Sequence, residues 1–221
     1  MAFRGFPDDA LAFFAELEAD NTKVFWTANK ARYDTAIKRP MAELVAELDD
    51  VGPFHIFRPH NDVRFAKGRP PYKTAIGAHS ESEGGTGYYV SLSAAGLMAG
   101  AGYYFMRPDQ LGKFRSAVDD DVTGPDIGAI CDTLTESGFS IGASDSLKTA
   151  PRGYPKDHPR VELLRRKGLA ATRVFAPAAW LRTAKTVGRI RETWQALAPL
   201  SHWLDSHVGP STLAPEDAER Y

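Results

Sequence analysis

The stretch GYYVSLS (residues 87–93), followed closely by GLMAGAGYYFM (residues 96–106), decides the fold class of this chain. In the first stretch Tyr88, Val90 and Leu92 alternate with Tyr89, Ser91 and Ser93, which predicts a strand with one apolar and one wet face. Both stretches are aromatic-rich and are separated by a short turn. Together with similar short stretches at 54–58 and 62–66 and at 74–80, they predict an antiparallel meander.

Helical periodicity dominates the first fifty residues. A start signal of proline and two acids, Pro7-Asp8-Asp9, opens a first apolar stripe. A second stripe has spacings of four, four, three and four residues: Tyr33, Ile37, Met41, Leu44 and Leu48. Pro40 interrupts this second stripe, so we expect a kink there, or a helix restart with Pro40 in its first turn.

The second half of the chain alternates helices and strands. We expect helices from Pro108 and over about 126–136, strands at 139–142 and 169–175, and a closing helix pair that ends near Leu204. The predicted fold is therefore α+β: an N-terminal helical pair, a central antiparallel sheet and C-terminal helices packed on it. Without a repeat or a convincing linker, residues 1–208 are expected to form a single domain, with 209–221 as a disordered tail.

Composition restricts the kind of protein. The formal net charge of −1 gives no overall attraction to nucleic acid or to an anionic membrane. No run reaches the roughly 18 apolar residues of a membrane helix, and the N-terminus lacks the pattern of a signal peptide. The single cysteine, Cys131, excludes an internal disulfide and a cysteine-rich zinc site, and its helical setting predicts burial. A soluble, cytoplasmic protein is expected.

Cations gather in two runs. Residues 55–79 carry five Lys/Arg against one Asp, and residues 148–173 carry eight Lys/Arg against two acids. Arginine binds carboxylate or phosphate through a planar fork, and lysine supplies a mobile point charge. If the fold brings the runs together they form a basic pocket; otherwise they are two solvated loops.

The first run supplies most of the candidate residues. In a strand over 62–66, Asp62 and Arg64 would share a face, so that Asp62 could orient Arg64 or act as a base, or the two could form a surface ion pair of little value. Lys67 and Lys73 are candidate ligand contacts. Tyr72 follows two prolines and could contact a ligand, although a core position is the commoner outcome.

The second run also presents cations on turns that contain proline. Arg152 and Arg160 stand on proline-stiffened turns, and His158 lies between them. His158 is a candidate proton-transfer group, with a capping or structural role as the alternative. The six histidines show no paired spacing, so the sequence predicts no metal site. The glycines Gly96, Gly100 and Gly102 indicate close strand packing or a bulge rather than a dinucleotide site, and no cofactor is expected.

Four segments, taken in order, resemble the bacterial and fungal family named domain of unknown function 2461, from about Phe6 to Leu204. They include DVRFAKGRPPYKTAIGA and LKTAPRGYPKDHPRVELLRRKGL. The family's motif positions fall on both basic runs: Asp62, Arg64, Phe65, Lys67, Pro71, Tyr72, Lys73, Thr74, Arg152, Gly153, Asp157, His158, Pro159 and Arg160. One departure is the pair Phe25-Trp26 before Asn29, which we expect to affect packing more than chemistry. The resemblance implies no activity, substrate or cofactor.

The leading hypothesis is binding of a small anionic ligand, bearing phosphate or carboxylate, in a pocket built from both runs. Catalysis stays open, with Asp62 or His158 moving protons beside the cations. One alternative is a nucleic-acid-binding module in which Tyr72, Tyr88 and Tyr89 stack on bases, which the net charge disfavours. Another is a partner-binding protein without catalysis. The sequence leaves the oligomeric state open.

Overall fold

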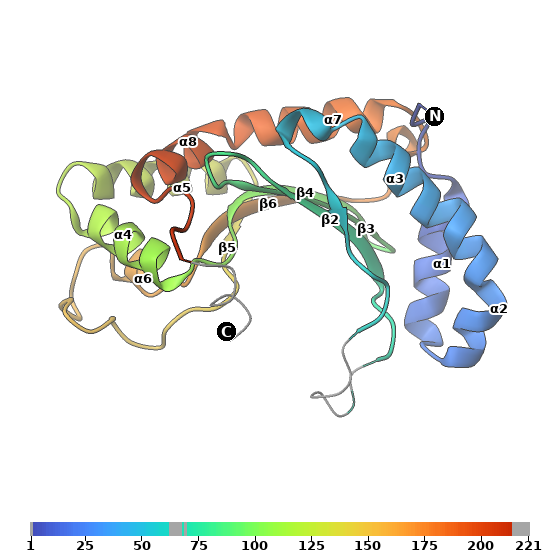
Figure 1. The fold of residues 1–221 in the computed structure, drawn as a ribbon, viewed down its shortest axis with the longest axis horizontal. Helices are drawn as coiled ribbons and strands as arrows, with labels where there is room; N and C mark the ends of the chain where they lie inside the picture. The colour runs from blue at the N-terminus through green and yellow to red at the C-terminus, as the bar shows by residue number, and fades with distance from the viewer. Residues whose placement is uncertain (1, 62–67, 69, 214–221) are drawn as a thin grey trace. The chain divides into compact units, whose positions relative to one another are not determined.

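The computed structural model describes residues 2–61, 68 and 70–213. Its fold is α+β, which confirms the predicted class, and a six-stranded sheet has the strand order β1-β2-β3-β4-β6-β5 (Figure 1). The strands are β1 (His55–Ile56), β2 (Ala75–Glu81), β3 (Gly87–Ser93), β4 (Gly96–Tyr103), β5 (Ser140–Gly142) and β6 (Leu169–Phe175). β1 pairs antiparallel with β2, and β5 pairs antiparallel with β6 with Ile141 opposite Ala171.

The chain divides into two compact units, each built from discontinuous segments. Unit 1 comprises Met1–Ser80, Tyr89–Ala99 and Val174–Thr193. Unit 2 comprises Glu81–Tyr88, Gly100–Arg173 and Trp194–Tyr221. The division passes through four of the strands, and the single domain expected over residues 1–208 stays a prediction.

Unit 1 contains the N-terminal helices, which lie side by side in Figure 1. They are α1 (Asp8–Ala19), α2 (Lys23–Tyr33), the π-helical turn η1 (Asp34–Lys38), α3 (Arg39–Ala46) and the 3-10 turn η2 (Asp49–Val51). The 3-10 turn η3 (Ala179–Arg182) and the first part of α7 (Lys185–Ala196) also belong to this unit. The predicted stripe from Tyr33 to Leu48 is buried throughout, since each of its five side chains is at most 3% exposed.

Pro40 shapes the junction between α2 and α3. Because proline has no N–H, it cannot continue the α-helical ladder, and its ring crowds the carbonyl four residues earlier. The turn before it widens, so the N–H of Arg39 donates to the carbonyl of Asp34, five residues back. Pro40 then lies in the first turn of α3, as expected for a restart, but Lys38 and Arg39 before it keep helical dihedrals, so the helical run is continuous there.

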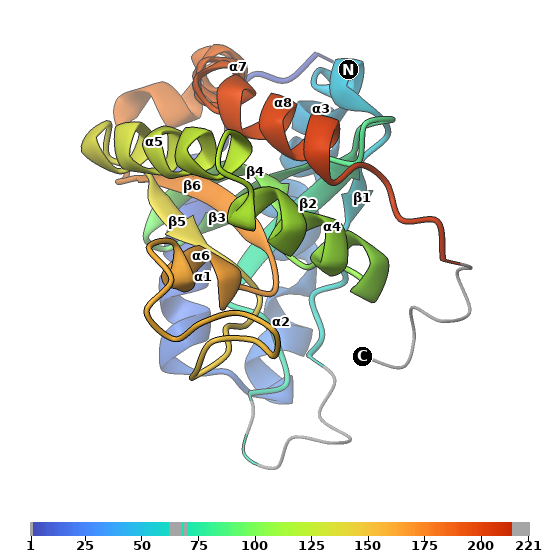
Figure 2. The same ribbon diagram turned by 90° about the vertical axis from the view of Figure 1, so that its left-hand side faces the viewer.

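Unit 2 contains the remaining helices: α4 (Pro108–Asp119), α5 (Thr123–Glu136), α6 (Val161–Leu164) and α8 (Ala198–His207). α4, α5 and α8 pack together, as Figure 2 shows. Cys131 on α5 is buried as predicted, and burial raises the pKa of its thiol to about 11. α5 starts three residues before the predicted position because the Asp120 carboxylate accepts the N–H groups of Val122 and Thr123.

Glycines let β4 approach β6 closely, as predicted. A Cβ on Gly100 would lie 2.6 Å from the carbonyl oxygen of Ala171, and one on Gly102 would lie 2.5 Å from that of Leu169. The expectation of a wet face on β3 was wrong at Ser91, which is only 5% exposed. β3 is an interior strand, and on its second face the Tyr89 ring lies over Gly77 of β2, so polar side chains there are covered as well.

No helix in the described part of the chain is both long and apolar enough to span a membrane. The predicted tail, 209–221, is described only as far as residue 213. There Thr212 donates from its N–H to Asp109 at 2.8 Å, and the Leu213 carbonyl accepts from Arg107 at 2.7 Å.

Candidate functional site

Unit 1 contains a cleft of about 550 Å³ with a strongly cationic lining. Three arginines line it, Arg4, Arg39 and Arg182, together with one carboxylate, Glu43. The other lining residues are Ala2, Gly5, Phe6, Pro7, Thr35 and Pro40. Its volume lies in the range of roughly 300–1,000 Å³ that is usual for small-molecule sites.

One wall is the N-terminal segment, which lies against η3. The N–H of Phe6 donates to the carbonyl of Leu181 at 2.8 Å. Gly5 has φ +114°, and a Cβ there would lie 2.0 Å from the carbonyl carbon of Arg182. Only glycine therefore permits this approach, which places Arg4 and Arg182 at the same cleft although they are far apart in the sequence.

The other wall is the helical run through η1 and α3. Thr35, Arg39 and Glu43 are four residues apart, so they follow one side of this run. The opposite side carries Ile37 and Met41, both fully buried. Packing of the apolar side against the core of unit 1 therefore holds the polar side toward the cleft.

The charges of the cleft are only partly compensated by protein groups. Arg182 pairs with Asp8 through one terminal nitrogen, at 2.6 and 2.8 Å from the two carboxylate oxygens. Arg4 and Arg39, both exposed, make no side-chain hydrogen bond or ion pair with any described residue. Three guanidinium groups thus stand against the two carboxylates of Glu43 and Asp8, and a positive excess remains.

Of the first basic run, the structure describes residues 55–61, 68 and 70–79, and the segments on either side of the undescribed residues are called the stem here. His60 and Tyr72 form an antiparallel bridge, and the N–H of Asn61 donates to the carbonyl of Pro71 at 2.9 Å. Asn21 binds the same stem through two hydrogen bonds. Its side-chain amide donates to the Tyr72 carbonyl and accepts from the Tyr72 N–H, both at 3.0 Å. The candidates Asp62, Arg64 and Lys67, and the strand predicted over them, lie outside the described residues.

Tyr72 and Lys73 occupy defined places at this stem. The Tyr72 ring is 6% exposed and stacks on Trp26, with ring centroids 4.3 Å apart and planes at 10°. Trp26 is itself buried, so the Phe25-Trp26 pair contributes to packing here. The ammonium of Lys73 lies 5.2 Å from the centroid of the Phe57 ring.

In the second run, His158 and Arg160 are bonded to the end of α4. The Arg160 guanidinium donates to the carbonyls of Val118 at 2.6 Å and Asp119 at 2.9 Å, which lack helical partners. His158 Nε2 lies 3.1 Å from a carboxylate oxygen of Asp119, and Nδ1 accepts the N–H of Arg160 at 3.0 Å. Both nitrogens of this buried ring are therefore engaged within the protein.

Other cations of the second run also make internal contacts. The Arg165 guanidinium donates to the Leu147 carbonyl at 2.6 Å, and Lys167 pairs with Asp145 at 2.5 Å. That pairing lowers the pKa of the Asp145 carboxyl. Arg152 is exposed and has no side-chain hydrogen bond or ion pair to a described residue. The first run belongs to unit 1 and the second to unit 2, and their convergence stays a prediction.

The contacts of Arg160 give a stability prediction. Arg160→Ala should lower the free energy of unfolding by about 1–3 kcal/mol, because it leaves carbonyls at the end of α4 without their charged donor. Arg152→Ala should change it by at most about 0.5 kcal/mol, as is usual for an exposed side chain. Urea unfolding followed by circular dichroism measures both. Equal effects of the two substitutions would contradict the capping role of Arg160.

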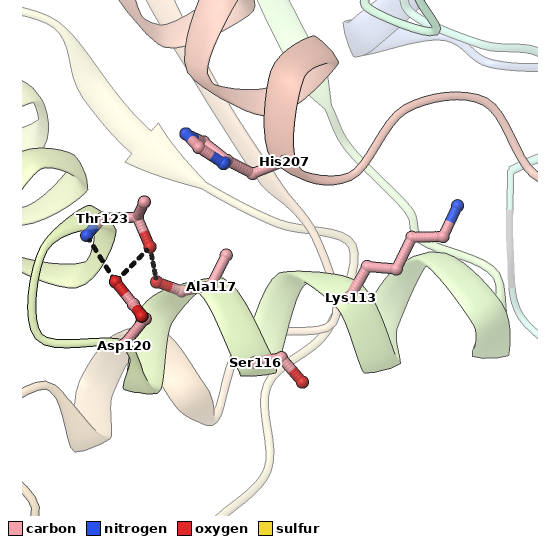
Figure 3. Close-up of a pocket in the computed structure, with 6 residues that line it drawn as sticks. All are labelled: Lys113, Ser116, Ala117, Asp120, Thr123 and His207. Carbon is pink, nitrogen blue, oxygen red and sulfur yellow. Dashed lines mark hydrogen bonds between the residues drawn. The ribbon is translucent and has the colours of Figure 1, made fainter.

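A second hollow, of about 500 Å³, lies in unit 2 between α4, the start of α5 and the end of α8 (Figure 3). It is lined by Lys113, Ser116, Ala117, Asp120, Thr123 and His207. Asp120 already accepts the backbone N–H of Thr123 at 2.9 Å, and such bonds lower the pKa of its carboxyl. The N-terminus of α5 is therefore occupied by a protein carboxylate, which makes this hollow a poorer anion site than the arginine-lined cleft.

Metal chemistry has no candidate centre in the described part of the chain, where no group of three or more His, Cys, Asp or Glu side chains is placed to hold an ion. The sequence did not single out Arg4, Arg39, Arg182 or Glu43. None of them belongs to the two basic runs, and Arg182 lies far along the chain from the others. The one available signal was Pro40, whose break in the apolar stripe marks the wall that carries Arg39 and Glu43.

The fold and cleft thus define an α+β protein with a cationic small-molecule-sized cleft. The model of the conserved hypothetical protein family DUF2461 matches residues 9–203, and the chain belongs to this family. This confirms the resemblance noted in the sequence. The chain matches no curated protein and no solved structure.

Proposed function

We propose that this protein binds a small anionic ligand, bearing carboxylate or phosphate, in the cleft lined by Arg4, Arg39 and Arg182. The observation that carries the proposal is the meeting of three guanidinium groups at one cleft of about 550 Å³. Arg4 and Arg39 have no acidic partner among the described residues, so their guanidinium groups are left to bind an anion. Planar forks of this kind suit bidentate binding of carboxylate or phosphate.

The lining also suits a small molecule rather than a polymer. The cleft holds a few charged groups in a volume of about 550 Å³, which is the size of a small-ligand site. Nucleic-acid binding draws less support, because the Tyr72 ring is buried against Trp26 and the Tyr88 ring contacts Trp194. A binding role in the cytoplasm stays our expectation, and the proposal assigns no reaction.

Thermal unfolding in the presence of anions tests the proposal. Phosphate, sulfate or citrate should raise the Tm of the wild type above its value in chloride at matched ionic strength. A ligand at a hundredfold excess over its Kd stabilises the native state by about 2.7 kcal/mol. The double variant Arg4→Gln/Arg39→Gln should lose the specific part of this gain. It should keep the general effect of sulfate, which strengthens apolar burial in any protein.

Two further variants sharpen the result. Lys23→Gln/Arg189→Gln removes two exposed cations elsewhere and should respond to anions like the wild type. Arg64→Ala/Arg152→Ala tests the location predicted from the basic runs, where Lys67, Lys73 and Arg160 are the other candidate cations. If only this variant loses the response, the ligand binds at those runs and the arginine-lined cleft is the wrong location. If every variant responds like the wild type, the protein has no specific site for these anions, and partner binding becomes the leading alternative.

A further inference from the structure

The arginine-lined cleft contains one carboxylate that its arginines do not neutralise. Glu43 is half-buried and lines the cleft one helical turn after Arg39 on α3. Within the described part of the chain, no Lys, Arg or His nitrogen lies within 4.0 Å of its carboxylate, and no hydrogen bond reaches it. The cleft is therefore bipolar, with an unpaired negative group kept apart from the positive ones.

The spacing along α3 explains why the two charges stay apart. Arg39 and Glu43 are in an i, i+4 relation, but the arginine precedes the glutamate, which is the less favourable order for an ion pair on a helix. Arg182, from η3, is already bonded to Asp8. Thus no arginine of the cleft forms an ion pair with Glu43, and its carboxylate is left to accept a hydrogen bond from a ligand.

From this arrangement we infer that the ligand is zwitterionic. This inference rests on the anion-binding function proposed above. The carboxylate or phosphate of the ligand binds the arginines, and an ammonium group on the same small molecule donates to Glu43. A plain anion satisfies only the arginines and is repelled by Glu43. An amine alone satisfies only Glu43 and is repelled by three guanidinium groups. A molecule with both groups on a short body complements both kinds of charge in the lining.

Matched pairs of ligands test this in titration calorimetry on the full chain. Phosphoethanolamine and ethyl phosphate share the phosphate and differ in the ammonium group, as do β-alanine and propionate for the carboxylate. The wild type should prefer the amine-bearing member of at least one pair by about 10- to 100-fold, the range of a charge-assisted hydrogen bond. The pair that shows the preference identifies the anionic group as phosphate or carboxylate.

Glu43→Gln should reverse the order within that pair. Binding of the zwitterion should weaken by about tenfold or more, because its ammonium then faces only guanidinium groups. Binding of the plain anion should strengthen, because a repelling carboxylate is removed. Glu43→Asp keeps the charge and should retain a preference for the zwitterion. This crossover cannot come from a loss of stability, which would weaken both ligands together.

Equal binding of both members of each pair by the wild type would overturn the zwitterion assignment and leave the anion-binding function standing. So would a preference that persists unchanged in Glu43→Gln. If neither member of either pair binds the wild type, and the anions of the thermal test also fail, the proposed function falls together with this assignment. Should Glu43→Gln not fold, the wild-type preference still decides.

Discussion

Gly102→Ala is expected to lower the free energy of unfolding by about 3–5 kcal/mol, through backbone strain and overpacking together. Gly102 has φ +130°, a conformation that side chains rarely adopt, and it lies in β4 beside β6. A Cβ there would lie 2.5 Å from the Leu169 carbonyl oxygen and 2.7 Å from the Ala170 Cα. Both atoms are backbone, so the strand itself has to move. Urea unfolding followed by circular dichroism measures the loss.

Gly112 provides the matched control for this substitution. It lies inside α4, and a Cβ there would meet nothing within 4 Å. Gly112→Ala should therefore raise the free energy of unfolding by about 0.5–1 kcal/mol, the gain in helix propensity. If Gly102→Ala also stabilised the protein, the close approach of β4 to β6 would be wrong.

Phe14→Ala is the other large effect, and it should cost about 3–5 kcal/mol. Phe14 is fully buried on α1, and its ring lies edge-on to that of Phe13 with centroids 5.7 Å apart. Removing it leaves a cavity that its close-packed neighbours fill only in part. Calorimetric and urea unfolding should agree on the loss.

Val24 on α2 provides the exposed counterpart in the same unit. Its side chain is 80% exposed, so Val24→Ala should change the free energy of unfolding by no more than about 0.5 kcal/mol. A loss in Phe14→Ala no larger than that of Val24→Ala would show that α1 does not pack in the core.

Gly102→Ala and Phe14→Ala, the two substitutions with large expected effects, also test the single-domain prediction. Phe14 lies in unit 1 and Gly102 in unit 2. If residues 1–208 form one cooperative domain, each substitution should shift the same single transition, seen alike by fluorescence and by circular dichroism. Two transitions, each moved by only one substitution, would show instead that the units unfold as separate domains.

The periodic parts of the chain were predictable because their structure depends on neighbours in sequence. The stripe from Tyr33 to Leu48 repeats at helical spacing, and all five of its side chains are buried. The stretch LAATRVF was predicted as a strand over residues 169–175, the range that β6 occupies. Pro40 lies in the first turn of α3, one of the two places expected for it, since its missing N–H acts on its own turn whatever surrounds it.

The burial of a strand face and the partners of a charged side chain could not be predicted in the same way as the periodic parts of the chain. Alternation in GYYVSLS could not show that the face carrying Ser91 is covered as well, because burial depends on residues distant in the sequence. Likewise, the second basic run was recognisable as a charge cluster. Its sequence gave no sign that Arg160 is bonded to the end of α4, some forty residues away along the chain.

By itself, then, the sequence determined the α+β class, the positions of most helices and strands, and the family. Those features follow from local periodicity and from motifs that are contiguous along the chain. The cleft was decided by tertiary structure alone. Gly5 allows the N-terminal segment to lie against Arg182, and the turn before Pro40 holds Arg39 and Glu43 on one side of the helical run. Charges so far apart in the chain become one binding surface only when the core is packed, because electrostatic and hydrogen-bonding interactions depend on distance in space and not along the sequence.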